Sequence, residues 1–258
     1  MSLVRAKKHL GQHFLTDKNI AEKIVKSLRS TDQYDQILEV GPGMGILSDF
    51  LLSRDKPEAF LIDIDHESFD FLAGKYPMLG ERLIHGDFLE LDFRKIFSGR
   101  LGIIGNFPYN ISSQILFKVL DNRDQVVELV GMFQKEVAER CAEKPGSKEY
   151  GILSVFLQAF YKVEYLFSVK PGVFNPPPKV TSAVIRLTRN EVERLDCDEK
   201  LFWQVVKAGF NQRRKTLRNA LSSFIGKEGM NDPVFDLRAE KLSVEDFIRL
   251  TNLVSALR

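Results

Sequence analysis

The stretch that decides the fold is ILEVGPGMGILSDFLL, residues 37 to 52. An apolar strand leads into three glycines at alternate positions, Gly41, Gly43 and Gly45, and a helical pattern follows. Glycines at such a junction let the backbone turn sharply and let a ligand approach it closely. The spacing is GxGxG and not the GxGxxG of dinucleotide binders, and no Lys-Ser/Thr pair follows, which excludes a phosphate-binding P-loop.

Apolar runs alternate with longer amphipathic segments up to about residue 190. Helical patterns over 44–54, 66–76 and 112–120 lie between the early strands. This alternation is typical of an α/β protein with a mostly parallel sheet. The segment PGVFNPPP joins the last two strands without a clear helix, which favours a closing hairpin. We expect seven strands, at 36–40, 59–64, 82–85, 101–105, 126–133, 161–168 and 181–188.

Strand signals stop after Asn190. The segments 198–210, 213–225 and 243–257 have helical patterns instead. We therefore expect two domains, an α/β domain over residues 1–190 and a small all-helical domain over residues 191–258.

Composition excludes several classes of protein. No apolar run reaches the roughly 18 residues of a membrane span, and the N-terminus lacks the apolar region of a secretory signal. Cys141 and Cys197 have neither metal nor redox spacing, which predicts reduced thiols and a cytoplasmic protein. Net charge is only +2, but residues 201–227 contain six basic residues and no acid, a pattern that suggests a polyanionic partner.

Two acids follow the next two strands. Asp63 stands twenty-two residues after Gly41, at the end of the second strand, and Asp87 follows the third. Open α/β sheets bind ligands at the carboxyl ends of their strands, and a carboxylate there can accept both hydroxyls of a ribose. Taken singly, the glycines could form a plain tight turn, and each acid could be a solvated loop residue or a helix cap. Their combined spacing favours a nucleoside-type site.

The fourth strand delivers Asn106-Phe107-Pro108-Tyr109 to the same edge. An exocyclic amine of a nucleobase is a poor nucleophile, and it needs acceptors for its two N–H bonds. The side-chain oxygen of Asn106 and a neighbouring carbonyl can supply them, Pro108 stiffens the turn, and the ring of Tyr109 offers a stacking face. A strand-ending turn with a core tyrosine is the structural alternative.

The motifs EVGPGMG, IDID, GDFLE and NFPY, in this order, resemble those of S-adenosylmethionine-dependent methyltransferases that modify amino nitrogens. With KKHLGQHFL (7–15), GVFNPPPKVTSAVIRL (172–187) and FNQRRKTLRNAL (210–221), the chain resembles the small-subunit ribosomal RNA adenine N6,N6-dimethyltransferase family. The resemblance implies a Rossmann-like methyltransferase domain and dimethylation of two adjacent adenines near the 3′ end of that RNA, with a role in ribosome biogenesis.

The resemblance also implies roles for individual residues. His13 stands where the family usually has Asn, and Asp63 where it usually has Glu. Asn106 would be shared by cofactor and target, and Tyr109 and Phe174 would clamp the target base. Ile64 and Phe88 could flank the cofactor's adenine or belong to the core. The cofactor-binding residues would be Gln12, His13, Leu15, Gly41, Asp63, Asp87 and Asn106.

The stiff VFNPPPKV segment independently suits Phe174 to presenting an aromatic ring, although a core anchor is the alternative. The basic residues at 213–218 lie in a predicted helix, and we expect them to contact phosphates as an RNA-binding surface. They are Arg213, Arg214, Lys215 and Arg218.

Expected partners are small-subunit ribosomal RNA and the assembling small subunit (pre-30S), with no membrane and no metal, and the protein is expected to be a monomer. Two other functions stay open. One is methylation of large-subunit RNA in antibiotic resistance, against which the RRKTLRN segment speaks, and the other is a non-enzymatic assembly factor.

Overall fold

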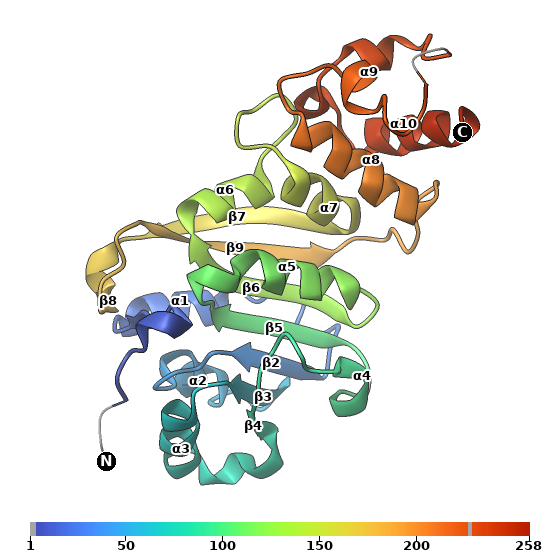
Figure 1. The fold of residues 1–258 in the computed structure, drawn as a ribbon. Helices are drawn as coiled ribbons and strands as arrows, with labels where there is room; N and C mark the ends of the chain where they lie inside the picture. The colour runs from blue at the N-terminus through green and yellow to red at the C-terminus, as the bar shows by residue number, and fades with distance from the viewer. Residues whose placement is uncertain (1–3, 227–228) are drawn as a thin grey trace. The chain divides into compact units, whose positions relative to one another are not determined.

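The computed structural model describes residues 4–226 and 229–258 (Figure 1). By contacts the chain divides into two units, Met1–Ala138 with Lys162–Arg189, and Glu139–Tyr161 with Asn190–Arg258. The segment Glu139–Tyr161 thus groups with the C-terminal residues. The two domains expected from the sequence, 1–190 and 191–258, remain a prediction.

The first unit is built on one sheet, and each expected strand is present. The strands are β2 (Gln36–Val40), β3 (Glu58–Asp63), β4 (Leu83–His85), β5 (Leu101–Asn106), β6 (Val126–Gln134), β7 (Tyr161–Val169) and β9 (Ser182–Arg189). Their order is β4-β3-β2-β5-β6-β9-β7. The pairs among β4, β3, β2, β5 and β6 are parallel, and β6–β9 is antiparallel. The expected Rossmann-like, mostly parallel seven-stranded sheet is confirmed, and β7 and β9 are neighbours, as a closing hairpin requires.

The central strands are mostly apolar, apart from the buried Glu39 in β2 and Glu128 in β6, because they are buried on both faces. All of β5 and β6 except the last residue of each is buried. The helices of this unit are α1 (Lys18–Lys26), α2 (Ile46–Leu51), α3 (His66–Lys75), α4 (Phe93–Ile96), α5 (Ser112–Asp121) and the start of α6 (Lys135–Ala142). Aspartates begin several of them, as when Asp17 caps α1 by accepting from the backbone N–H groups of Asn19 and Ile20.

A second, two-stranded sheet closes over the strand ends. It pairs β1 (Phe14–Leu15) with β8 (Phe174–Asn175) in antiparallel register. The N-terminal segment and the loop that carries three consecutive prolines, far apart in sequence, therefore lie side by side.

The second unit contains α7 (Ile152–Phe160), α8 (Glu199–Asn211), α9 (Leu217–Ala220) and α10 (Val244–Ala256), with short 3₁₀ turns at Pro233–Asp236 and Ala239–Lys241. The expected helices at 198–210 and 243–257 are confirmed. The helix expected over 213–225 is wrong: residues 212–214 form a turn, Thr216 is the extended cap residue of α9, and only the four residues of α9 are α-helical. Among the residues described in either unit, no helix is long and apolar enough to cross a membrane.

Candidate active site

The carboxyl ends of β2, β3, β4 and β5 meet at one edge of the sheet, as parallel pairing dictates. A pocket opens there, and most of the predicted site residues line it: Gln12, His13, Gly41, Asp63, Asp87, Asn106 and Tyr109. Leu15 and Phe174 are absent from this lining. The fold thus brings to one place residues that come from five separate segments of the chain.

The glycine loop needs glycine for two different reasons. Gly41, Gly43 and Gly45 all have positive φ, at 67°, 57° and 79°. Residues that carry a side chain rarely adopt this backbone conformation. A Cβ atom on Gly43 would lie 2.7 Å from the Phe14 ring, whereas one on Gly41 would meet nothing within 4 Å. Gly43 is therefore fixed by packing under the N-terminal segment, and Gly41 presents bare backbone to the pocket.

Asp63 and Asp87 differ in how many of their carboxylate oxygens already accept a hydrogen bond from the protein. Asp63 is 5% exposed, and its oxygens accept from the backbone N–H of Gly43 at 3.1 Å and of Asp65 at 2.9 Å. Burial raises the pKa of its carboxyl group, and these two hydrogen bonds oppose the rise. In Asp87, Oδ1 accepts from Leu89 N at 2.8 Å, and the structure shows no partner for Oδ2 among the described residues. Asp63 thus organises the loop, whereas Asp87 has one carboxylate oxygen with no hydrogen-bond partner among the described residues.

Phe107, which the sequence analysis left without a role, holds the turn that carries Asn106 and Tyr109. Gly105 and Gly131 face each other on β5 and β6, and a Cβ on either would lie 2.9 Å or 2.1 Å from the Phe107 ring. The ring is 1% exposed and packs on Phe133 with centroids 4.9 Å apart. A glycine pair on neighbouring strands signals that another group approaches the sheet closely, and this signal could have been found in the sequence.

Two contacts fix the side chain of Tyr109, one at its hydroxyl group and one at its ring. Its hydroxyl is hydrogen-bonded to Ser182 Oγ, and its ring stacks on that of His13 with centroids 5.3 Å apart and planes at 28°. Burial raises the pKa of its phenol. One face of the Tyr109 ring is therefore covered by His13.

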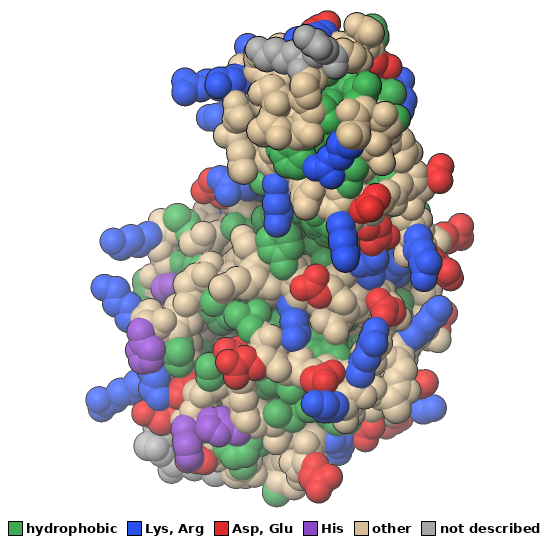
Figure 2. Space-filling view, turned by 45° about the vertical axis from the view of Figure 1, so that its right-hand side comes forward, with side chains coloured by type: hydrophobic (Ala, Val, Ile, Leu, Met, Phe, Trp, Pro, Cys, Tyr) green, Lys and Arg blue, Asp and Glu red, His purple; other side chains and the backbone are tan. Residues whose placement is uncertain are grey.

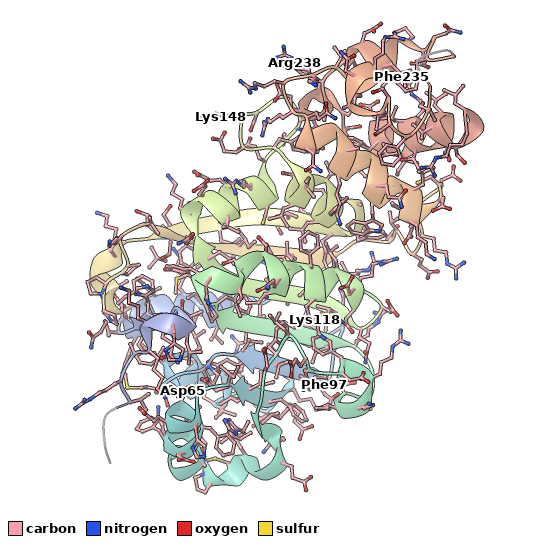
Figure 3. All side chains as sticks on the ribbon, viewed as in Figure 1. Asp65, Phe97, Lys118, Lys148, Phe235 and Arg238 are labelled. Carbon is pink, nitrogen blue, oxygen red and sulfur yellow. The ribbon has the colours of Figure 1, made fainter. Side chains whose placement is uncertain are left out.

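The N-terminal segment is tied down by a buried acid that the sequence analysis missed. Asp65 (labelled in Figure 3) caps α3 and is 2% exposed. It pairs with Lys7 and accepts from Gln12 Nε2 at 3.3 Å. Gln12 Oε1 in turn accepts from the backbone N–H of Lys7 at 2.8 Å. Burial alone would raise the pKa of Asp65, but the hydrogen bonds from Lys7, Gln12 and Ser68 outweigh it and hold that pKa low. The side chain of Gln12, a residue that lines the pocket, thus anchors the N-terminal segment.

Phe174 packs in the core instead of facing the pocket. It is 4% exposed and belongs to the same apolar cluster as Leu15, its partner in the β1–β8 pairing. Leu15 also borders a neighbouring hollow that includes Gly41 and Asn106. The ring predicted to clamp a target base has, in this structure, the position of the core anchor that was its alternative.

The predicted RNA-binding residues, which lie in the second unit, fall into two kinds. Arg213 pairs with Glu240 at 2.9 Å and donates to Ser147 O at 3.1 Å. Arg218 pairs with Asp236 at 2.8 Å and donates to Met230 O at 2.7 Å. The acids that balance them come from residues 232–240, so the absence of acids within 201–227 did not mean unpaired cations. Lys227 lies outside the described residues.

Arg214 and Lys215 are exposed, and no ion pair to either is found in the described part of the chain. Backbone hydrogen bonds between Gly146 and Glu240 (2.7 Å) and between Leu217 and Leu237 (2.8 Å) bring the surrounding loops together. These loops add two exposed cations, Lys148 and Arg238, which project from the same side of this unit in Figure 3. By contrast, Lys and Arg side chains on the face drawn in Figure 2 are interspersed with acidic ones.

A parallel sheet with a closing hairpin, a GxGxG loop, acids at successive strand ends and an Asn-Phe-Pro-Tyr turn define the class of Rossmann-like, S-adenosylmethionine-dependent methyltransferases. Within it, residues 3–256 match the family described as ribosomal RNA adenine dimethylase. The chain belongs to this family, as the sequence motifs predicted, and its activity is that of a ribosomal RNA adenine dimethyltransferase.

Relatives from several bacteria agree. The chain is 57% identical, over 99% of both chains, to the "Ribosomal RNA small subunit methyltransferase A" of Cytophaga hutchinsonii. It is 53% identical to the protein of the same name from Bacteroides thetaiotaomicron, over 98% of this chain and 96% of that one. Among solved structures, a dimethyladenosine transferase from Plasmodium falciparum superposes with a TM-score of 0.76 at 26% identity, covering 92% of this chain and 96% of that one. The 23S rRNA methyltransferase ErmE shares the fold, with a TM-score of 0.72 at 22% identity over 94% and 99% of the two chains.

Proposed function

We propose that this protein transfers methyl groups from S-adenosylmethionine to N6 of two adjacent adenines in a loop near the 3′ end of small-subunit ribosomal RNA. Relatives at 52–57% identity over nearly the whole chain are named for the small subunit, which supports this target. The observation that carries the proposal is the orientation of Asn106, whose Nδ2 donates to His13 O at 2.8 Å.

The residues of the pocket fit the proposed cofactor. The carboxylate of Asp63 has lone pairs left for ribose hydroxyls, and the free Oδ2 of Asp87 can accept from the adenine amine. Gly41 gives a ligand direct access to backbone, since no side chain stands there. Ile64, which is 51% exposed, and Phe88 both line the pocket and would flank the adenine. When bound, the cofactor supplies an electrophilic methyl group on a sulfonium centre.

The residues around the target amine would position it and accept its protons. Because Nδ2 of Asn106 is used by His13, Oδ1 is the atom that faces a ligand, and it can accept one N–H bond of adenine N6. A main-chain carbonyl of the turn would accept the other, and the open face of Tyr109 would stack the base. Orientation and a fixed polar environment would then provide most of the catalysis. The adenine must be unpaired or flipped out, since N6 is buried in a duplex.

In the second unit, Arg214 and Lys215 are the proposed phosphate contacts, because they are exposed and have no ion pair among the described residues. Arg213 and Arg218 would act mainly by holding the loops that present them. We further propose that the protein acts as a monomer on the assembling small subunit in the cytoplasm. No group of His, Cys, Asp or Glu side chains that could hold a metal is found among residues 4–226 and 229–258, and the proposed reaction uses none.

Mass spectrometry of both ribosomal RNAs from cells with and without this protein tests the proposal. We expect two dimethyladenosines near the 3′ end of the small-subunit RNA to disappear with the protein. Loss of a modification from the large-subunit RNA would favour the resistance-type function instead. Unchanged modification with delayed subunit assembly would favour a purely structural role.

A further inference from the structure

A second hollow adjoins the catalytic pocket in the first unit, and nothing in the proposed reaction uses it. Its lining includes the loop Pro176–Val180, with the exposed Pro176 and Pro177, and Lys8 from the N-terminal segment. Four residues line both cavities: Gly11, Gln12, His13 and Tyr109. A ligand in this hollow would therefore lie directly beside a base held on Tyr109.

The described residues that line the hollow include basic side chains but no acidic ones. Lys8 and Lys179 are exposed, and no ion pair to either is found within the described residues. The rest of the surface is mainly neutral, with prolines and the rings of His13 and Tyr109. Cations beside flat apolar surface are the combination by which proteins hold single-stranded nucleic acid, with the phosphate on the cations and the base on the rings.

His13 connects the hollow to the catalytic turn. Its Nδ1 lies 2.8 Å from Pro176 O, its ring stacks on Tyr109, and its main-chain oxygen accepts from Asn106. The proline wall, the stacking ring and the amide acceptor are thus joined through one residue. A ligand that contacts the proline wall is therefore linked, through His13, to the groups proposed to position the target base.

We propose that this hollow binds the nucleotide adjoining the target adenine on the same RNA strand. Its base would lie against His13 and the prolines, and its phosphates between Lys8 and Lys179. The inference rests on the proposed function, because flipping a base into the pocket brings its backbone neighbours to the pocket's mouth. The two lysines, with no acidic side chain among the described lining residues, argue for RNA over a protein segment as the occupant.

A photocrosslink tests which molecule occupies the hollow. Val180, which is 44% exposed on its rim, is replaced by p-benzoylphenylalanine in the full-length protein, and Pro177 is replaced in a second variant. Each is irradiated with small subunits from cells that lack this protein, and crosslinked RNA is mapped by primer extension. We expect stops within one or two nucleotides of the adenine that wild-type protein methylates in the same particles. Crosslinks only to distant RNA, only to ribosomal protein, or from neither position would overturn the proposal.

A charge substitution tests the phosphate contacts. Single-stranded RNA gives a slope of log affinity against log salt of about 0.7 per neutralised phosphate, so the Lys8→Gln/Lys179→Gln variant should flatten the slope by about 1.4. KM for the particles should rise with kcat nearly unchanged, and affinity for S-adenosylhomocysteine should stay the same. The matched control is Lys18→Gln/Lys56→Gln, two exposed lysines of the same unit that do not line the hollow. Equal slopes in the two variants would remove the hollow from the RNA-binding surface.

These outcomes separate the two proposals. If wild-type protein leaves the small-subunit adenines unmethylated, the proposed function fails, whatever the crosslinks show. If those adenines are methylated but the crosslinks and slopes exclude the hollow, only the further inference fails.

Discussion

The side-chain amide nitrogen of Asn106 donates a hydrogen bond to the main-chain oxygen of His13 across 2.8 Å. An asparagine amide carries two N–H donors on its nitrogen and an acceptor oxygen, so this bond fixes the nitrogen toward the N-terminal segment and leaves Oδ1 as the acceptor for the proposed ligand. In the proposed function, the N-terminal segment thereby sets which end of Asn106 would meet the target amine. A main-chain oxygen makes this bond, so the change from the family's usual asparagine to His13 preserves it.

Removing this acceptor should remove most of the activity. Asn106→Ala is expected to lower the rate of methyl transfer by about 100-fold or more, the usual loss when one preorganised polar group is deleted from an active site. Single-turnover methylation of unmodified small subunits at saturating cofactor measures it. A rate near that of the wild type would show that Asn106 is only a turn residue.

Asp63→Ala should weaken cofactor binding by more than tenfold, because two ribose hydrogen bonds to a charged acceptor would be lost, each worth about 1.5–3 kcal/mol. The substitution also frees Gly43 N, which loosens the glycine loop. Calorimetric titration with S-adenosylhomocysteine measures the affinity. Unchanged affinity would sink the assignment, and Glu67→Ala, an exposed acid four residues along, serves as the control.

Gly131→Ala should disturb the catalytic turn without touching the cofactor. The new methyl group would lie 2.1 Å from the Phe107 ring, and overpacking a core of this kind typically costs about 1–3 kcal/mol of stability. We expect a lower thermal midpoint and slower methylation, with affinity for S-adenosylhomocysteine within about twofold of the wild type, a free-energy change under about 0.5 kcal/mol. A variant with normal turnover would show that the position of Phe107 does not matter for catalysis.

The two kinds of basic residue in the second unit should behave differently. Arg214→Gln/Lys215→Gln should flatten the salt dependence of RNA binding by about 1.4–1.8, at 0.7–0.9 per phosphate, without changing stability. Arg213→Gln should instead lower the unfolding midpoint, because it breaks the pair with Glu240 and the bond to Ser147 O. Filter binding across a salt series and thermal unfolding separate the two effects. Equal slopes for the double variant and the wild type would exclude these side chains from the RNA contacts.

Glu39 gives a pH prediction. It is 1% exposed beside the glycine loop, and burial raises its pKa to about 8 although Ser48 donates to it at 2.7 Å. A group whose pKa is higher in the folded state binds more protons there, so its contribution to stability is full below the unfolded pKa of about 4.5 and is lost as pH rises toward 8. Glu39→Gln should reduce this decline, as measured by urea unfolding at pH 5, 6.5 and 8. An identical pH profile in the variant would show that Glu39 is not protonated in the folded state.

Local sequence signals determined the framework of this protein. Seven strands were identifiable because each is a short apolar run bounded by turn residues, and parallel pairing then placed Gly41, Asp63, Asp87 and Asn106 at one edge. Residue type set the available chemistry, since carboxylates, an amide and a tyrosine follow those strands in order. These features depend on residues that are neighbours along the chain or on the regular geometry of a parallel sheet. Both can therefore be inferred from the sequence.

Only the tertiary structure decided which groups remain free for a ligand. Phe174 is buried because β8 pairs with β1, and Arg213 and Arg218 are neutralised by acids 18 to 27 residues away in sequence. Asp65 holds Lys7 and Gln12 across more than fifty residues. Hydrogen bonds and ion pairs form between whatever side chains the fold brings within about 3 Å, and that proximity is a property of the packed chain that residue spacing does not contain.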